Sequence, residues 1–413
     1  MKFFASAVSG TRARWFRFSV APILLISTLG LALLGAGCSD ETEDVTFPAA
    51  PPPEEMNWLF DVFGTAADDV YACGNKGAMF HFDGESWGPA LEMGTGSPIT
   101  KIWGPDGGPL YAIGHAGNLW QMVAGSWSGQ TSGTSKNLYG IGIFAQELHI
   151  TGADGTLRKL NGNSWDGVGQ IMVIRNPGGN HAVEDTLMLN EDVISLMDLN
   201  EYFIVGAYKT LDYEGEYIGL NGTDGMVMST DEEPENYDWE LRPLGDDEFA
   251  LSEWMMCTTS SPNLNDNYLG TSEGWIFQLV ESDDGENVWS KMSPDATDRS
   301  KSGIRDMWLD ENSNLYFVTD SGYLYFQTQD YNFSEDIGTR KSFHISHGGL
   351  TSVWGADTDH IFMTGFTENT IFHASMDFTD TTLVFTADTT LEFPNKGGQS
   401  IGMFEDQFGM PRF

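Results

Sequence analysis

The chain has 413 residues, with 60 Asp and Glu against 20 Lys and Arg, a formal net charge of −40, and 13% aromatic residues. The aromatic content excludes a disordered or fibrous chain, because so much apolar ring surface has to be buried in a core. The negative charge excludes a nucleic-acid-binding face, which needs clustered Lys and Arg against the phosphates. Dense carboxylates suit a salty medium, and they also attract divalent cations or basic partners.

Residues 1–37 have the composition of an export signal. The first 17 residues carry four basic side chains and no acidic one, residues 18–34 are mainly apolar, and three small residues precede Cys38. A basic segment, an apolar segment and a small-residue processing site in this order predict a signal peptide over 1–37. An ordinary secretory signal and an uncleaved membrane anchor are the alternatives.

The residues around Cys38 resemble the lipobox of bacterial lipoproteins. The match is Leu34-Gly-Ala-Gly-Cys38, with Gly35 at the position where Leu is usual. The resemblance implies acylation of Cys38 and, with the neutral Ser39 after it, sorting to the outer membrane. Residues 38–55 combine like charges with prolines, so they are expected to form a disordered tether. We assign residues 56–413 to one folded domain.

A repeat of about 40 residues starts in this domain. Three consecutive units cover 61–87, 101–127 and 148–165. In each unit a β-type run ends at Gly, and a Gly-x-x-Gly turn, an alternating run and a Gly-x-x-Trp turn follow. Period-two alternation between such turns predicts four short antiparallel strands per unit.

Four looser units follow at 202–239, 268–289, 306–326 and 352–373. Units of 40 to 50 residues with four strands each predict a β-propeller, in which every sheet buries both faces against its neighbours. We therefore expect an all-β fold with seven four-stranded blades. Six or eight blades are the alternatives, because the stretch 165–239 is long and the last 20 residues are ambiguous.

Tryptophans recur at two positions of the unit. One set is Trp103, Trp308 and Trp354, and the other is Trp87, Trp127, Trp165, Trp239 and Trp289. Large rings at repeated positions predict packing between blades. A platform that stacks on carbohydrate is the alternative.

The first unit and residues 352–365 resemble a known family. Their Trp-Gly and Gly-x-x-Gly pattern is similar to the repeats of predicted propeller lipoproteins of delta-type proteobacteria such as myxobacteria. Ser229-Thr-Asp231, followed by Trp239, is similar to the Asp-box of sialidase and photosystem II assembly-factor-like propellers, without the Gly that follows the Asp. The resemblance covers about residues 56–393 and implies the fold, not an activity.

No residue is predicted to be catalytic or to bind a cofactor. A sialidase needs an arginine cluster for its substrate carboxylate. The chain after Cys38 has seven arginines, which are Arg158, Arg175, Arg242, Arg299, Arg305, Arg340 and Arg412. Their spacing marks no such cluster. Channel carboxylates are too abundant for the sequence to single out a glycosidase pair.

Two patterns resemble metal sites only in part. His81, His115 and His149 fall in successive units but at different positions, so a ring of metal ligands is not predicted. The alternate spacing that starts a calcium loop occurs at 310, 312 and 314, where the residues are Asp310, Asn312 and Asn314. Leu315 replaces the turn glycine and Ser321 replaces the closing Glu, so a hairpin turn is the better prediction. Calcium binding stays an alternative without a complete motif.

Two cysteines follow Cys38. Cys73 and Cys257 lie in apolar, strand-like segments of distant units. We predict buried free thiols, because such a cysteine packs as a small hydrophobe. A disulfide is the alternative for an exported protein.

The sequence thus favours a monomeric, non-catalytic, lipid-anchored propeller of the cell envelope that binds a protein or a glycan. The insertion 208–220 and the loops of 167–192 are the expected recognition surface. The alternatives are a glycan-cleaving hydrolase or lyase that uses channel carboxylates, and a structural envelope component. Convergent channel carboxylates with perturbed pKa values would favour the enzyme.

Overall fold

The computed structural model describes a set of stretches between residues 57 and 394. These are 57–144, 147–168, 171–174, 185–188, 192–198, 203–208, 225–230, 240–241, 255–259, 261, 266–281, 285, 287–292, 302–331, 338–367, 369–377, 382–389 and 391–394. The predicted signal peptide, Cys38, the tether, and most of the expected recognition loops lie outside the described residues. The predictions made for them are not tested here.

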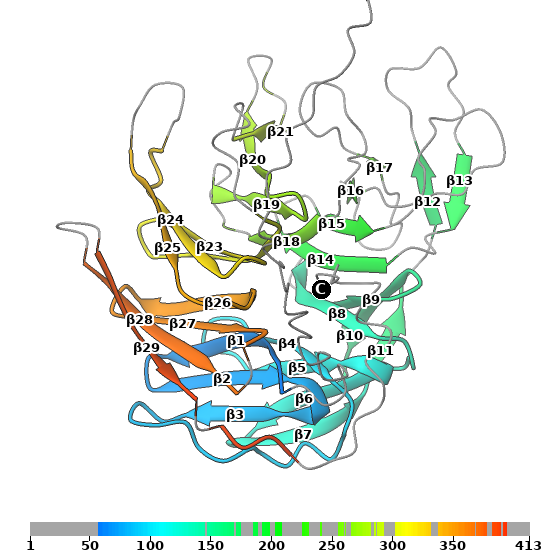
Figure 1. Ribbon diagram of the computed structural model, residues 1–413. Coiled ribbons are helices and arrows are strands. Elements are labelled where there is room, and N and C mark those ends of the chain that lie inside the picture. The colour runs from blue at the N-terminus through cyan, green and yellow to red at the C-terminus, as the bar shows by residue number, and fades with distance from the viewer. Residues whose placement is uncertain are drawn as a thin grey trace, which may run out of the picture. The chain divides into compact units, whose positions relative to one another are not determined.

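The described strands form antiparallel sheets in chain order (Figure 1). The first sheet has three strands, β1 (Leu59–Ala66), β2 (Asp69–Gly74) and β3 (Met79–Phe82). Two four-stranded sheets follow, β4 (Ile99–Trp103), β5 (Tyr111–Gly114), β6 (Asn118–Val123) and β7 (Ser126–Thr131), then β8 (Leu138–Phe144), β9 (Glu147–Gly152), β10 (Thr156–Asn161) and β11 (Ser164–Gly167). A separate hairpin consists of β12 (Ile171–Ile174) and β13 (Asp185–Met188).

Four more four-stranded sheets complete the described strands. They are β14 (Asp192–Asp198), β15 (Phe203–Tyr208), β16 (Gly225–Thr230) and β17 (Glu240–Leu241); β18 (Met255–Thr259), β19 (Tyr268–Thr271), β20 (Ile276–Glu281) and β21 (Asn287–Lys291); β22 (Ile304–Leu309), β23 (Leu315–Thr319), β24 (Tyr323–Gln327) and β25 (Arg340–His344); and β26 (Leu350–Asp357), β27 (His360–Gly365), β28 (Ile371–Asp377) and β29 (Thr382–Asp388).

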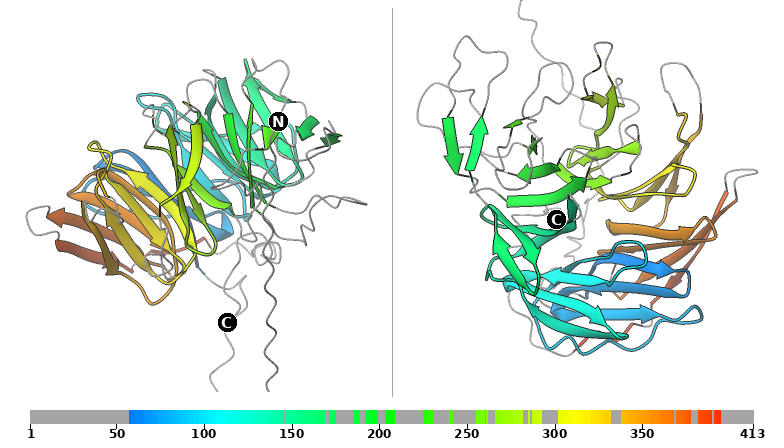
Figure 2. Two further views of the ribbon diagram at one scale, coloured as in Figure 1. Left: turned by 90° about the horizontal axis from the view of Figure 1, so that it is seen from above. Right: turned by 180° about the vertical axis from the view of Figure 1, so that it is seen from behind.

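The first strand of each sheet contacts the first strand of the next. The contacts run from β1 through β4, β8, β14, β18, β22 and β26, and β26 contacts β1 again. The first and last repeats therefore lie side by side, as both views in Figure 2 show for the blue and orange sheets. The protein is an all-β β-propeller.

The number of four-stranded sheets differs from the expected seven. Six four-stranded sheets are present in the part of the chain that the structure describes, which is the lower of the alternatives left open. Seven four-stranded blades are not supported, because the first repeat forms a three-stranded sheet.

Proline explains the missing strand of that first sheet. The backbone N–H groups of Gly88 and Leu91 donate to the carbonyls of His81 and Met79 on β3, over 2.8 Å each. Pro89 lies between the two donors, has no N–H, and cannot continue the ladder. The position of the fourth strand, beside β3, is therefore taken by an irregular segment.

The predicted Gly-x-x-Gly turns are confirmed. Short 3-10 turns follow β2 at Asn75–Gly77 and β5 at His115–Gly117. Gly77 and Gly117 have φ angles of +69° and +70°, and an added Cβ would lie 2.3 and 1.9 Å from the carbonyl oxygens of Thr95 and Thr134. Only glycine fits both the left-handed backbone and the close approach of the neighbouring chain.

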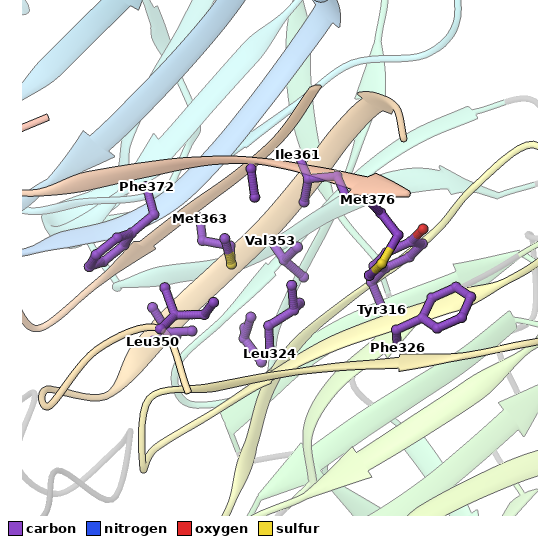
Figure 3. Packing of buried hydrophobic residues seen from close by; sticks show 12 residues of the cluster. Tyr316, Leu324, Phe326, Leu350, Val353, Ile361, Met363, Phe372 and Met376 are labelled. Carbon is purple, nitrogen blue, oxygen red and sulfur yellow. The ribbon is translucent and has the colours of Figure 1, made fainter. Parts of the chain in front are cut away.

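The core lies between adjacent sheets. One cluster joins Tyr316, Leu324 and Phe326 of the β22–β25 sheet to Val353 and Met363 of the β26–β29 sheet, all fully or nearly fully buried. Figure 3 shows these side chains pointing at one another from the two sheets. Apolar burial between sheets, rather than within one, therefore holds the repeats together.

The tryptophans pack between sheets, as predicted. Trp308 lies against Gly355 of the next sheet, and Trp354 against Gly64 of the next, where an added Cβ would be 2.5 and 2.6 Å from the indole. Trp87 of the first sheet approaches Phe362 of β27 with a ring separation of 6.1 Å. Trp239 lies outside the described residues.

The two thiols are buried and free, as predicted. Neither Cys73 on β2 nor Cys257 on β18 forms a disulfide. Burial disfavours the thiolate and raises the pKa of both thiols well above the usual value. They act as small apolar side chains of the core.

Candidate functional site

A β-bulge occurs at the same position of every innermost strand. In each strand the pairing register skips one residue near its start, and a bulge of this kind redirects the side chain that follows. The residues that follow the skipped position are Asp61, Lys101, Gly140, Ser195, Cys257, Asp306 and Ser352. Because the strands meet in a ring, polar residues at this position converge from different repeats.

Three of these residues form one hydrogen-bonded cluster. Ser352 Oγ lies 2.8 Å from Asp61 Oδ1 and 2.5 Å from Asp306 Oδ2. Asp61 belongs to the first sheet, and Asp306 and Ser352 belong to the two sheets that precede it around the ring. The cluster thus joins the two ends of the repeat array, across 291 residues of sequence between Asp61 and Ser352.

Ser352 is the shared hydrogen-bond donor of the cluster. A serine hydroxyl carries one proton, so Ser352 can donate to only one of the two carboxyl groups. Both carboxyl groups lie within hydrogen-bond distance of the hydroxyl, so they compete for this one donor. Protonation of one carboxyl group relieves the competition, because that group can then donate instead.

Asp61 is the residue suited to carry this proton. Its residue surface is 4% exposed, and this burial raises its pKa from 3.8 to about 6. The carboxylate of Asp306 also raises the pKa, whereas Lys101, the N–H of Ile102 and the hydroxyl of Ser352 oppose the shift. Burial is the dominant cause.

Lys101 is the cation of the cluster. Its Nζ lies 4.0 Å from Asp61 Oδ1, and 34% of its side chain is exposed. Burial disfavours the ammonium form, but the carboxylates of Asp61 and Asp306 outweigh that effect, so the pKa of Lys101 is raised. Lys101 therefore stays charged at any physiological pH.

The two carboxyl groups also bind the backbone of the next sheet. Asp61 Oδ2 accepts from the N–H of Ile102 on β4 over 2.6 Å. Asp306 Oδ2 accepts from the N–H of Val353 on β26 over 3.1 Å. Ile102 and Val353 hold equivalent places, one residue after Lys101 and Ser352. Each aspartate therefore joins its own sheet to the following one.

Asp61, Lys101 and Asp306 line a cavity of about 900 Å³ that is bordered by the innermost strands. Two exposed residues lie at its rim, Asp106 in the turn after β4 and Ala356 near the end of β26. A volume of this size falls within the range of ligand sites in proteins. The cavity is the candidate functional site.

Aromatic side chains stand between the cluster and the rim. They are Phe63, Trp103, Trp308 and Trp354, each two residues after the bulge-following residue of its strand, all half-buried and all lining the cavity. We call this set the aromatic arc. Its strands β22, β26, β1 and β4 contact one another in succession (Figure 1). Two residues along a strand correspond to about 7 Å, so the aromatic arc lies about that distance from the cluster in the direction of the rim.

The histidines singled out in the sequence do not come together. His81 Nε2 contacts Asp69 Oδ1 at 2.9 Å and its ring stacks on Tyr71. His115 and His149 are buried, and loss of solvation lowers the pKa of each to about 4. Within the described stretches, no group of three or more His, Cys, Asp or Glu residues is placed to hold a metal ion.

The predicted hairpin turn at Asp310 is confirmed. Asp310 Oδ1 accepts from the backbone N–H groups of Asn312 and Asn314, over 2.8 and 2.9 Å, and Asp310 Oδ2 accepts from Asn314 Nδ2. The carboxylate thus caps the turn between β22 and β23. The described arginines, Arg158, Arg305 and Arg340, do not line the cavity.

Sequence reasoning did not identify the cluster residues. The available signal was a polar residue two positions before an aromatic one at the start of a unit, as in Asp61-Val-Phe63, Lys101-Ile-Trp103 and Asp306-Met-Trp308. Such a residue is out of place in a buried strand unless a bulge redirects it. The bulge itself leaves no mark in the sequence.

No protein-family model matches the chain, and no curated protein matches it. One similar solved structure is the extracellular domain of a putative one-component system from B. thetaiotaomicron, with a TM-score of 0.52, 16% identity and coverage of 78% of this chain and 38% of that chain. The chain thus spans about two fifths of that domain. A second is the RRP9 WD40 repeats, with a TM-score of 0.51, 11% identity and coverage of 75% and 88%.

YCF48 from Cyanidioschyzon merolae aligns with a TM-score of 0.49, 15% identity and coverage of 76% and 94%. Within the residues that the structure describes, no helix has the length and apolar character of a membrane span. At these identities, the likeness to the extracellular domain and to the WD40 repeats shows the β-propeller fold alone.

Proposed function

We propose that the chain is a non-catalytic, lipid-anchored propeller of the cell envelope that binds a protein or glycan partner at the channel. The observation that carries the proposal is the cavity of about 900 Å³, which is lined near its rim by the half-buried residues of the aromatic arc. Half-buried aromatic rings on a rigid scaffold offer contact area that costs little conformational entropy on binding. The partner would approach from the rim.

The arrangement of the carboxyl groups supports binding rather than hydrolysis. A glycosidase needs two carboxyl groups on opposite sides of an open space that the sugar occupies. Here the hydroxyl of Ser352 lies between Asp61 and Asp306 and contacts both. Both aspartates also accept backbone N–H groups, so their oxygens are already engaged in joining sheets.

One observation favours the glycan-cleaving alternative. Asp61 has a pKa raised to about 6 and converges with Asp306 in the cavity, which is the pattern of a general acid. Turnover of a panel of glycans, lost on Asp61→Asn, would establish this alternative. Binding of a glycan without turnover would support the proposal.

The anchor is proposed from the sequence around Cys38. The test compares membrane fractions of cells that make the wild-type chain and the Cys38→Ala variant. Release of the variant into the soluble fraction supports acylation at Cys38. Retention in the membrane would contradict the lipid anchor and leave the channel proposal untouched.

The binding proposal is tested with the full chain solubilised from membranes and used as bait against an envelope extract. The variant Trp103→Ala removes one ring of the aromatic arc, and the matched control Phe385→Ala removes a 40% exposed ring from β29. A saturable partner that Phe385→Ala retains and Trp103→Ala loses supports binding at the channel. A partner lost only with Phe385→Ala would contradict it.

A further inference from the structure

The cavity is lined by aromatic residues from four strands and by glycine, isoleucine and threonine from two others. The aromatic arc belongs to four consecutive strands, and Phe63 and Trp354 lie within it at a ring separation of 5.9 Å. The lining from β8 and β18 consists of Gly140, Ile141, Gly142, Ile143, Thr258 and Thr259. The two glycines have no side chain, which leaves room in the cavity for a ligand side chain.

The charges along the cavity are mostly negative. Among the described residues, the lining includes the carboxyl groups of Asp61, Asp106 and Asp306 and one ammonium group, that of Lys101. Fully ionised, these groups carry a net charge of −2. Lys101 belongs to the cluster below the aromatic arc, whereas Asp106 is exposed at the rim. A ligand that enters from the rim therefore meets a carboxylate and aromatic rings before it meets Lys101.

The net charge of the chain also favours a cationic ligand. The whole chain has a formal net charge of −40, which attracts cations and repels anions over the distance of a Debye length. Aromatic rings, and tryptophan above all, bind a cation placed over the ring face. Among the described residues, no group of three or more His, Cys, Asp or Glu side chains is placed to hold a metal ion.

We propose that the aromatic arc binds a positively charged side chain, Arg or Lys, of a partner protein, with Asp106 at the rim as its counter-charge. This proposal rests on the proposed function and names the class of its partner. The cavity of about 900 Å³ accommodates an extended basic side chain together with its backbone. Trp103 also lines a second pocket of about 280 Å³, together with Tyr111 and Glu147 among others.

The test uses three synthetic peptides of equal length in which Gly alternates with Arg, Gln or Glu. Each is titrated calorimetrically into the full chain, solubilised in detergent, at low salt and at about 0.15 M salt. The Arg peptide is expected to bind with one-to-one stoichiometry and at least about tenfold more tightly than the Gln peptide, and the Glu peptide is expected not to bind.

Variants separate the aromatic arc from the general acidity of the surface. Trp103→Ala is expected to weaken binding of the Arg peptide about tenfold, and Trp103→Phe to restore most of it, because phenylalanine keeps a ring face. Asp106→Asn should weaken binding about threefold and reduce its dependence on salt. The matched controls on β29, Phe385→Ala and Asp388→Asn, should leave binding unchanged.

Three outcomes would overturn the proposal. Binding of the Arg peptide that is insensitive to Trp103→Phe, Trp103→Ala and Asp106→Asn would show attraction to the acidic surface alone. Equal binding of the Gln peptide, or of a neutral oligosaccharide that depends on Trp103, would show that charge is not recognised. Equal binding of the Gln peptide and Trp103-dependent binding of the oligosaccharide each refute the ligand class but leave the channel as a binding site. Absence of any Trp103-dependent binding counts against both the basic ligand and the channel as the binding site.

Discussion

The cluster of Asp61, Ser352 and Asp306 predicts a specific dependence of stability on pH. Folding raises the pKa of Asp61 from 3.8 to about 6, chiefly through burial. Between these values the folded state binds more protons than the unfolded state, so the free energy of unfolding falls as pH rises. The contribution is fully present below pH 3.8 and lost as pH rises through about 6.

The size of the effect follows from the shift. A change of about two pH units corresponds to about 3 kcal/mol, of which about 1.4 kcal/mol falls between pH 5 and pH 8. Asp61→Asn removes the titrating group but keeps the bonding pattern of the protonated acid, because the amide accepts from Ile102 and donates to Ser352. The stability of the variant, minus that of the wild type, should therefore rise by about 1.4 kcal/mol from pH 5 to pH 8.

The measurement is urea unfolding followed by tryptophan fluorescence at constant ionic strength, at half-unit steps of pH. Asp388→Asn, which removes a carboxylate on β29 away from the cluster, controls for the loss of one negative charge. A difference between Asp61→Asn and wild type that stays within about 0.5 kcal/mol over this range, or that falls with pH, would refute the proton count and the burial of Asp61 on which it depends.

Two further predictions concern packing. Gly64→Ala places a Cβ 2.6 Å from the indole of Trp354 and 2.8 Å from the carbonyl oxygen of Asp69, and should lower the free energy of unfolding by about 1–3 kcal/mol. The control Gly129→Ala on β7, where the nearest atoms are 3.9 Å away, should be close to neutral. Equal losses of stability in urea unfolding would contradict packing between sheets. In the Cys38→Ala variant, Cys73 and Cys257 should resist alkylation at neutral pH until urea is added, because burial raises the pKa of both thiols; rapid labelling of the native chain, followed by mass spectrometry, would show that they are accessible.

The fold could be predicted because its signals are local. Gly77 and Gly117 mark turns that only glycine can form, and their spacing gives the length of the repeat. Trp308 and Trp354 each pack on a glycine of the following sheet, so the recurring tryptophan records contact between sheets as well as within one. Fold class and inter-sheet packing follow from such features.

The blade count and the site depend on contacts that are not local. Pro89 interrupts the fourth edge of the first sheet, an effect that the regular spacing of Gly and Trp conceals. Asp61 and Ser352 are 291 residues apart and meet only because the ring brings β26 against β1 and a bulge redirects both side chains. Neither register nor ring closure is encoded in the spacing of residues, so the cluster could not be deduced from the sequence.

Binding of the partner at the channel rim can be tested by site-specific photocrosslinking in intact envelopes. A benzophenone amino acid replaces either Ala356, which lies exposed at the rim of the cavity, or Val384, which is 68% exposed on β29. A discrete crosslinked partner is expected from position 356 and none from position 384. Crosslinking from 384 but not from 356 would contradict it.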